Sequence, residues 1–221
     1  MARCDTRDAD AGLWSEISGK EFAHRPALFL DRDGVLVEDT HYLGRAEDMR
    51  MLPGAADAIA RCNRLGIPVV LVSNQSGIAR GFYNWKGFHA VQAALASALT
   101  TGEAHLDAVF ACAYHGDGKA PLNIADHAWR KPNPGMIAAA GERMKLDVSR
   151  SWIVGNRASD IEAGSAAKLE GGILISPQAD ESERAAAVAL KAADFAVEIS
   201  PSLKDAVLLL LARGRLGAAA G

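Results

Sequence analysis

The sequence has few of the residues that mark several common protein classes. Its three cysteines, Cys4, Cys62 and Cys112, are scattered and form no C-x-x-C pair, which argues against a disulfide scaffold and favours a reducing compartment. Apolar runs such as VVLV and AVLLLLA are far shorter than the roughly 18 residues of a spanning helix. The first 26 residues contain five acids and lack the apolar core of a secretory signal. We therefore expect a cytoplasmic protein without a membrane anchor.

A strong charge of either sign is also missing. The formal net charge is −3 over 221 residues, so neither nucleic acid nor a membrane surface is an expected partner, and any anionic ligand has to be met by local cations. The apolar fraction of 49% is enough for one good core. We expect an N-terminal extension over 1–26, one domain over 27–212 and a flexible tail over 213–221. We expect a monomer rather than an oligomer.

Short apolar segments alternate with helical patterns along the chain, which predicts parallel strands joined by crossover helices. The expected fold is a three-layer, Rossmann-like α/β sandwich around a mainly parallel sheet, without a large cap domain. In such sheets ligands bind beyond the carboxyl ends of the strands. The expected strands cover 27–30, 67–72, 106–112, 151–155, 171–175 and 194–199, and the expected helices cover 54–65, 84–100, 133–146, 159–168 and 201–212.

The first expected strand ends in the motif DRDG, which carries two acids. In an extended chain, side chains two residues apart share a face, so Asp31 and Asp33 can address one substrate atom. One carboxylate can attack while the other handles a proton. A surface turn is the alternative for this motif, since Asp and Gly are common turn residues.

Three further polar motifs follow expected strands or open a helix. SNQSG follows the second strand, and its Ser73 and Asn74 can bind phosphate oxygens without adding charge. A helix cap is an equally good interpretation. WRKPNPG places Arg130 and Lys131 before a helix, where a lysine can neutralise a phosphate; exposed bases on a turn are the simpler alternative.

The fourth motif, VGNRASD, ends an apolar strand in a polar turn. An acid is expected at the tip of such a strand if the turn helps to hold a metal ion. The chain has Asn156 there and carries its carboxylate four residues later, at Asp160. The motif alone leaves open a metal site with a changed ligand, a displaced ligand or an ordinary loop.

Taken together and in this order, the motifs resemble the haloacid dehalogenase (HAD) superfamily of phosphohydrolases. The resemblance implies that Asp31 is the nucleophile and Asp33 the general acid and base. It also implies that Ser73 binds the phosphoryl group, Lys131 steadies the intermediate and the GNRASD loop helps to hold Mg²⁺. The metal would then lie between Asp31, the main-chain carbonyl of Asp33, Asn156 and Asp160.

Within this superfamily, the stretches DRDGVLVEDTHYL, VSNQSGIARGFY, RKPNPGM and VGNRASDIEAG are similar to the D-glycero-D-manno-heptose-1,7-bisphosphate 7-phosphatase group. The histidinol-phosphate phosphatases are close behind. The resemblance implies a small sugar phosphate as substrate. The residues expected to contact that substrate are Asp39, Tyr42, Ser73, Asn74, Gln75, Ser76, Arg130, Lys131 and Arg157.

The first departure from the group concerns zinc. The group commonly has a zinc loop with four Cys or His ligands, and here the matching positions are Cys112, Tyr114, His127 and Trp129. Only two of them are zinc ligands, whereas a tetrahedral site needs four. His115 and Asp126 are neighbours that could complete a site. We expect no zinc, and a loop over 113–129 in which Tyr114 and Trp129 pack by apolar contacts.

The second departure is Asn156, where the group usually has Asp. Asparagine still offers an oxygen to Mg²⁺ but removes one negative charge. Asp160 can compensate directly or through water, the ion can bind weakly, or the protein can bind phosphosugars without turnover. We favour a working phosphatase that needs much Mg²⁺. A histidinol-phosphate or broad phosphatase, and a non-catalytic phosphosugar-binding protein, are the alternatives.

Overall fold

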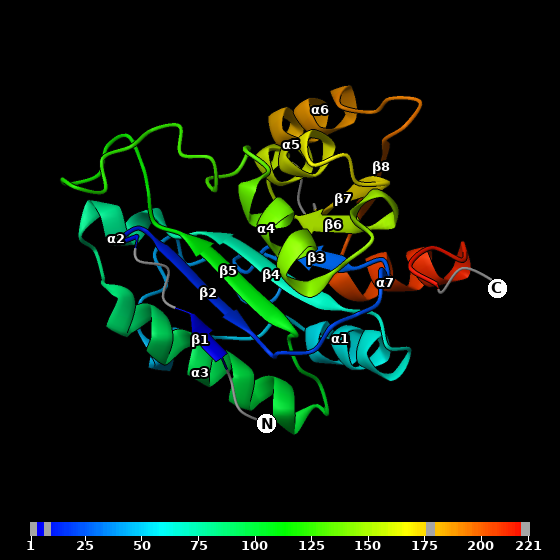
Figure 1. Ribbon diagram of the computed structural model, residues 1–221, viewed down its shortest axis with the longest axis horizontal. Helices are drawn as coiled ribbons and strands as arrows, with labels where there is room; N and C mark the ends of the chain where they lie inside the picture. Colours follow the sequence, from blue (N-terminus) through cyan, green and yellow to red (C-terminus); the bar gives the residue numbers. More distant parts are fainter. Residues whose placement is uncertain (1–3, 7–9, 176–179, 218–221) are drawn as a thin grey trace.

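One mixed sheet runs through the computed structural model, which describes residues 4–6, 10–175 and 180–217. Its six parallel strands are joined at one edge by an antiparallel hairpin, in the order β1-β2-β5-β4-β3-β6-β7-β8 (Figure 1). The strands are β1 (Cys4–Thr6), β2 (Leu13–Ile17), β3 (Leu28–Leu30), β4 (Val69–Asn74), β5 (Ala108–Cys112), β6 (Trp152–Gly155), β7 (Gly171–Ile175) and β8 (Ala196–Ser200).

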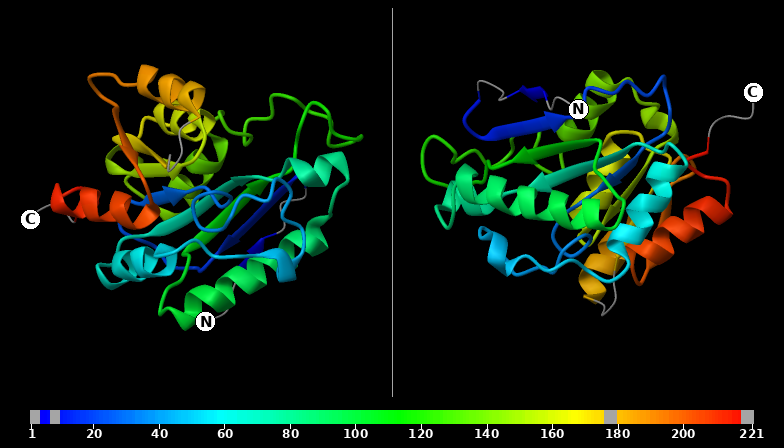
Figure 2. Two further views of the ribbon diagram at one scale, coloured as in Figure 1. Left: turned by 180° about the vertical axis from the view of Figure 1, so that it is seen from behind. Right: turned by 90° about the horizontal axis from the view of Figure 1, so that it is seen from below.

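Helices cover both faces of this sheet, as the views in Figures 1 and 2 show. Two separate apolar cores confirm the predicted three layers: one lies under α1, α3 and α7, and the other under α4, α5 and α6. The helices are α1 (Ala55–Arg64), α2 (Ser76–Arg80), α3 (Trp85–Thr101), α4 (Gly135–Met144), α5 (Ala158–Ala166), α6 (Glu181–Ala189) and α7 (Leu203–Ala212), with 3₁₀ turns η1 (Ala46–Asp48) and η2 (Val148–Arg150).

The apolar spacing explains these elements. In α1 the buried residues Ala55, Ala58, Ile59 and Cys62 recur at helical spacing and form one face. The parallel strands β3, β5 and β7 are buried along their whole length. Near-continuous apolar strands are typical of a parallel sheet that is covered on both faces.

The strand order places a binding crevice at one point of the sheet. From β3 the chain first builds outward through β4 and β5, and then returns to pair β6 with the other side of β3. The order therefore reverses beside β3, and ligands of such sheets bind beyond the carboxyl ends of the strands at that reversal. The polar motifs after β3, β4 and β6 lie at this edge.

Two strands, β1 and β2, and two helices, α2 and α6, were not predicted from the sequence. β1 and β2 form an antiparallel hairpin, and β2 pairs antiparallel with β5. The predicted division between 1–26 and 27–212 therefore does not follow the sheet. The short helix α2 lies inside the motif after β4, and α6 lies between β7 and β8. Both were missed because one has a single turn and the other is largely exposed and rich in alanine.

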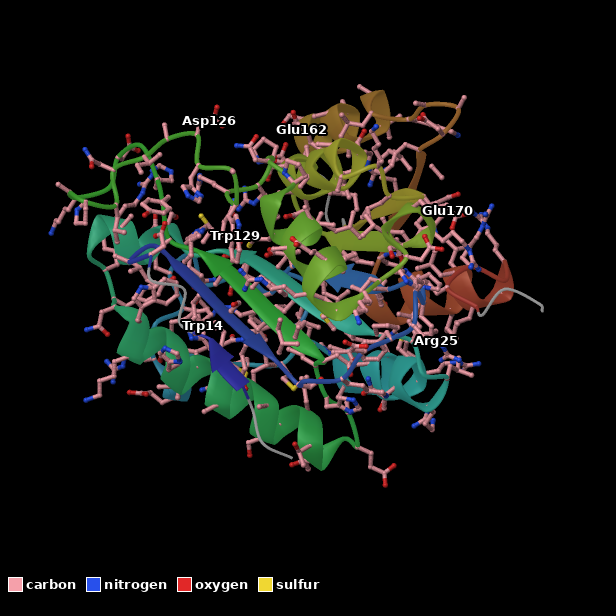
Figure 3. The ribbon with its side chains drawn as sticks, in the orientation of Figure 1. Trp14, Arg25, Asp126, Trp129, Glu162 and Glu170 are labelled. Atoms are coloured by element: carbon pink, nitrogen blue, oxygen red, sulfur yellow. The ribbon has the colours of Figure 1, made fainter. Side chains whose placement is uncertain are left out.

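Segments near both described ends of the chain pack on the domain. Trp14 on β2, which Figure 3 labels, is buried. It makes an edge-to-face contact with Phe88 of α3, with ring centroids 5.2 Å apart. At the other end, Leu216 is buried and Arg150 donates to the carbonyl of Gly217. The predicted flexible tail thus packs on the domain up to residue 217, and 218–221 lie outside the described residues.

The expectations about membrane-spanning helices and about the cysteines can be compared with the structure. Across the described ranges, no helix has both the length and the apolar character that a membrane crossing requires. Cys62 and Cys112 are free and buried. Burial raises the pKa of the Cys62 thiol to about 12 and that of Cys112 to about 11, and both side chains pack in the apolar cores.

Candidate active site

A cleft of about 600 Å³ opens at the carboxyl ends of β3, β4 and β6. It collects side chains from four segments that are far apart in the sequence, and most of them are the residues that the motifs predicted. The lining residues are Asp31, Asp33, Asp39, His41, Tyr42, Asn74, Ser76, Arg130, Lys131, Asn156, Arg157, Ser159 and Asp160.

Lys131 is the buried cation of this cleft. Its Nζ lies 2.8 Å from Asp31 Oδ1, 2.6 Å from Asp160 Oδ1 and 2.8 Å from the carbonyl oxygen of Val72. Burial alone lowers the pKa of Lys131, but Asp160 and Asp31 outweigh this effect and raise it above the ordinary value. The ammonium therefore stays charged, and its three donors are directed at three acceptors.

Asn74 holds the backbone of this lysine. Its Nδ2 donates to the carbonyl of Lys131 at 2.9 Å, and its Oδ1 accepts from the Lys131 N–H at 3.0 Å. The amide of Asn74 thus joins the end of β4 to the segment before α4. Sequence reasoning assigned Asn74 to phosphate binding, whereas the structure uses its side chain to position Lys131.

Asp160 is buried at the bottom of the cleft, with both carboxylate oxygens engaged by the protein. Besides the contact of Oδ1 with Lys131, Oδ2 accepts from the N–H of Arg157 at 3.0 Å and caps α5. A Cβ at Gly155 would lie 2.2 Å from the Cβ of Asp160, which explains the glycine in the motif. Both oxygens of Asp160 are thus engaged by the protein, and Asp160 faces Lys131 because the buried ammonium needs a counter-charge.

Asp33 is held by a residue that sequence reasoning missed. Arg32 is fully buried, and its Nε and Nη2 donate to Asp33 Oδ1 and Oδ2 at 3.1 and 3.0 Å. Its guanidinium lies 5.6 Å from the ring centroid of Phe88. Burial raises the pKa of Asp33 against the opposing effect of Arg32, and a raised pKa suits a carboxyl that has to donate a proton. The alternation of side chains along a strand does not predict this contact, because β3 ends at Leu30 and Arg32 lies at a bend.

Asn156 lies directly over the turn that follows the two acids. A Cβ at Gly34 would fall 2.2 Å from Asn156 Nδ2, so only glycine leaves room for the amide. Gly34 also has a φ of +77°, which other residues rarely adopt. The side chain of Asn156 is thereby brought to the Asp31–Asp33 segment, as the position of its motif after β6 predicted.

The donor set at this point suits Mg²⁺. Asp31 Oδ2 has no hydrogen bond to any described residue, and the amide of Asn156 lies beside the same turn. Mg²⁺ typically takes one or two carboxylates and completes its shell with waters and substrate phosphate. No group of three or more His, Cys, Asp or Glu side chains in the described parts of the chain is arranged to hold a metal. The ion would thus depend on Asp31, neutral oxygens and the substrate itself.

The segment after β4 does not place all of its predicted residues in the cleft. Ser73 and Gln75 are buried, and Gln75 Nε2 donates to Ser73 Oγ at 2.8 Å. Gln75 Oε1 accepts from the hydroxyl of Tyr83 at 2.6 Å. Neither Ser73 nor Gln75 is among the lining residues of the cleft, and both make hydrogen bonds inside the protein. Ser76, the first residue of α2, does line the cleft.

The residues expected to face a sugar lie at the mouth of the cleft. Arg157 Nη2 is 3.4 Å from Asp39 Oδ2, which links the loop after β3 to the start of α5. Arg130 donates to the carbonyl of Tyr114 at 3.0 Å, and Tyr42 lines the same cleft. These groups supply two cations and one acid around the entrance.

The loop 113–129 is held by ring contacts and polar links. Tyr114 stacks on His127 with centroids 4.3 Å apart, and Trp129, which Figure 3 labels, packs against Phe110 at 5.6 Å. The predicted packing roles of Tyr114 and Trp129 are confirmed. His115 Nε2 lies 3.1 Å from Arg80 Nη2, and Arg80 and Arg130 add to burial in lowering the pKa of His115.

The comparisons with known proteins agree with this geometry. The HAD-hydrolase-like family profile matches residues 128–205. A protein of Mesorhizobium japonicum named D-glycero-β-D-manno-heptose-1,7-bisphosphate 7-phosphatase is 48% identical over 77% of this chain and 79% of its own length. The chain belongs to the HAD family of phosphatases. A Haemophilus influenzae protein of the same name is 34% identical over 67% of this chain and 80% of its own.

Two solved phosphatase structures have a fold similar to that of this HAD phosphatase. A HAD-like phosphatase from Mesorhizobium loti matches with a TM-score of 0.83 and 40% identity, over 97% of this chain and 99% of that one. The D,D-heptose 1,7-bisphosphate phosphatase from B. bronchiseptica, solved with magnesium and phosphate, matches with a TM-score of 0.71 and 26% identity, over 85% and 99%. HAD phosphatases of this type use Mg²⁺, which fits the donor set of the cleft.

Proposed function

We propose that this HAD phosphatase removes the 7-phosphate from D-glycero-D-manno-heptose 1,7-bisphosphate through an aspartyl-phosphate intermediate. The observation that carries the proposal is the contact of 2.8 Å between Asp31 Oδ1 and the buried ammonium of Lys131, beside Asp33 in one cleft. The names of the relatives support the choice of sugar. A phosphate bound in this cleft lies next to a nucleophile, an acid and a fixed cation.

In the first half-reaction the Asp31 carboxylate attacks phosphorus. The bond between phosphorus and the sugar oxygen breaks, and Asp33 donates its proton to the leaving alkoxide. Lys131 keeps the Asp31 carboxylate oriented and offsets the negative charge that gathers there. The raised pKa of Asp33 supports its role as the proton donor.

In the second half-reaction Asp33 acts as a base. It takes a proton from a water molecule, which attacks the phosphorus of the aspartyl phosphate and regenerates Asp31 with release of inorganic phosphate. Arg32 donates one hydrogen bond to each oxygen of Asp33, and each oxygen keeps a second lone pair that can take or hold a proton. Arg32 is therefore a positioning residue that keeps Asp33 in one place.

Charge compensation decides how fast this chemistry can run. At about 4 Å and an effective dielectric of about 20, two like unit charges repel by about 4 kcal/mol. That corresponds to roughly three decades in rate if nothing compensates it. When bound, Mg²⁺ supplies positive charge at the phosphate oxygens, and Asp31 with the amide of Asn156 would hold it. Lys131 neutralises the carboxylate side.

The test is phosphate release from heptose bisphosphate, measured across a Mg²⁺ titration, with histidinol phosphate and acetyl phosphate as further substrates. The proposal predicts Mg²⁺-dependent release and the highest kcat/KM for the heptose bisphosphate. A higher kcat/KM for histidinol phosphate would replace the sugar assignment. No release from any of them at saturating Mg²⁺ would show a phosphosugar-binding protein instead of an enzyme.

The remaining expectations about context are part of the same proposal. Two buried free thiols suit a reducing compartment, so we place the enzyme in the cytoplasm. A cleft that is open to small metabolites gives no reason for nucleic acid or membrane partners, and we propose a monomer. The mass of the purified protein in solution checks the last point.

A further inference from the structure

Two exposed aromatic rings lie at the rim of the cleft. Tyr42 is 39% exposed and Phe82 is 61% exposed, and their ring centroids are 4.3 Å apart at an angle of 36°. Exposing two stacked rings leaves apolar area in water, which is unfavourable unless a ligand or partner covers it. This aromatic pair plays no part in the chemistry derived above.

The pair continues the wall of the active site outward. Tyr42 lines the same cleft as Asp31 and Lys131, and Phe82 extends that wall beyond the lining. The two rings come from different segments, the loop after β3 and the turn after α2. A ligand whose phosphate lies at Asp31 and whose carbon chain points out of the cleft would pass along this wall.

Gly77 of α2 lies close to the ring of Tyr42 and accepts a backbone hydrogen bond from Phe82. A Cβ at Gly77 would lie 3.0 Å from Tyr42 Cδ1 and 2.2 Å from Tyr83 Cε1, so the rings of Tyr42 and Tyr83 both lie directly against the backbone of α2. Tyr83 is in turn fixed by the hydrogen bond of its hydroxyl to Gln75 at 2.6 Å. The N–H of Phe82 donates to the carbonyl of Gly77 at 2.8 Å. The ring of Tyr42 and the backbone of Phe82 therefore need little ordering when a ligand binds, which lowers the entropy cost of binding.

We propose that Tyr42 and Phe82 form a platform for the C–H face of the substrate's sugar, with Phe82 as a specificity-determining residue. A sugar ring has a face of weakly polarised C–H bonds, and the negative face of an aromatic ring attracts them while both lose apolar area to water. Asp39 and Arg157 at the same cleft can bind the hydroxyls. This inference rests on the proposed function, because it concerns the non-reacting part of the same substrate.

Continuity with the cleft favours a small ligand over a protein partner. The rings adjoin charged groups that could neither be buried nor left unpaired under an apolar protein surface without cost. A sugar phosphate matches both features at once, since it presents a C–H face, hydroxyls and anionic ends. A second copy of the chain is the competing occupant, and it is one outcome of the test.

The test is the effect of Phe82→Ala on two substrates of different size. For heptose bisphosphate we expect KM to rise by about fivefold to tenfold with kcat little changed, which is the loss typical of one aromatic contact. Acetyl phosphate has no sugar to stack, so its kinetic constants stay the same. Phe82→Tyr keeps the ring and should retain the low KM. Leu65→Ala is the matched control. Leu65 is 54% exposed, but it precedes the amino-terminal end of β4, whereas the cleft lies at the carboxyl ends of the strands.

Each result has a defined meaning. An unchanged KM for heptose bisphosphate in Phe82→Ala, or an equal rise for acetyl phosphate, would overturn the platform. A change of solution mass in Phe82→Ala with constant KM would assign the rings to a second copy of the chain and overturn it as well. If no substrate turns over, the proposed function fails by itself. Titration calorimetry of heptose bisphosphate then tests the platform, and weaker binding to Phe82→Ala than to Leu65→Ala is expected.

Discussion

Asp160 and Lys131 form a buried ion pair in which Asp160 Oδ1 lies 2.6 Å from Lys131 Nζ. The same Nζ lies 2.8 Å from Asp31 Oδ1, so the lysine links the last acid of the site to the first. The carboxylate at residue 160 thereby contacts Asp31 through the lysine, and Asn156 is the residue of that loop that we propose as a ligand of the metal ion.

Replacing Asp160 with Asn should lower kcat with little change in the Mg²⁺ concentration for half-maximal rate. The buried ammonium loses its counter-charge, so Lys131 holds Asp31 less firmly. Removing one partner of a buried pair costs about 3 to 5 kcal/mol of unfolding free energy. Steady-state kinetics across a Mg²⁺ titration and urea unfolding measure the two effects. If high Mg²⁺ restores the full rate, Asp160 is a metal ligand and the assignment is wrong.

Replacing Asn156 with Asp should lower the Mg²⁺ needed for half-maximal rate by about tenfold, because a carboxylate is a stronger ligand than an amide. The two side chains have nearly the same shape, so aspartate fits over Gly34 in the same way. Asn123→Asp is the control, since it makes the same charge change at an exposed residue outside the cleft lining. An equal Mg²⁺ requirement in both variants would show that Asn156 does not face the ion.

Replacing Arg32 with Lys should lower kcat roughly tenfold and leave KM nearly constant, because small misplacements of a catalytic group are costly. Lysine keeps the positive charge but cannot bind both oxygens of Asp33, as the guanidinium does. Circular dichroism checks that the variant is folded. A larger effect on KM than on kcat would mean that Arg32 serves the substrate and not Asp33.

The motifs predicted most of the site because they follow strand ends. Asp31, Lys131 and Asn156 meet in one cleft, as the parallel topology requires. The direction of individual side chains was harder to predict. Ser73 turns into the protein and Asn74 clamps the backbone of Lys131, because the pleat and a partner 57 residues away decide these orientations. Such partners are not visible in a local pattern.

The parallel core was predicted well because its strands are continuous apolar runs. The hairpin of β1 and β2 was missed, since β2 has the mixed sequence LWSEI and is only partly buried. It becomes a strand by pairing with β5, a contact made across about a hundred residues of chain. Edge strands of this kind depend on tertiary context more than on local propensity.

The two described thiols should react only when the protein unfolds. Burial raises the pKa of Cys62 to about 12 and of Cys112 to about 11, from an ordinary value of 9.0. Since only the thiolate reacts, labelling of Cys112 at pH 8 should be at least roughly a hundredfold slower than in the unfolded chain. A Cys4→Ser variant titrated with a thiol reagent, with and without urea, measures this. Fast labelling of the native variant would contradict the burial of both thiols.

The central claim is that Asp31 carries the phosphoryl group during turnover. Rapid acid quenching of the enzyme with Mg²⁺ and heptose bisphosphate, followed by mass spectrometry of its peptides, tests this claim most directly. We expect a transient phosphoryl adduct on the peptide that contains Asp31, and neither adduct nor phosphate release in Asp31→Asn. Phosphate release by Asp31→Asn, or an adduct on another residue, would contradict the account.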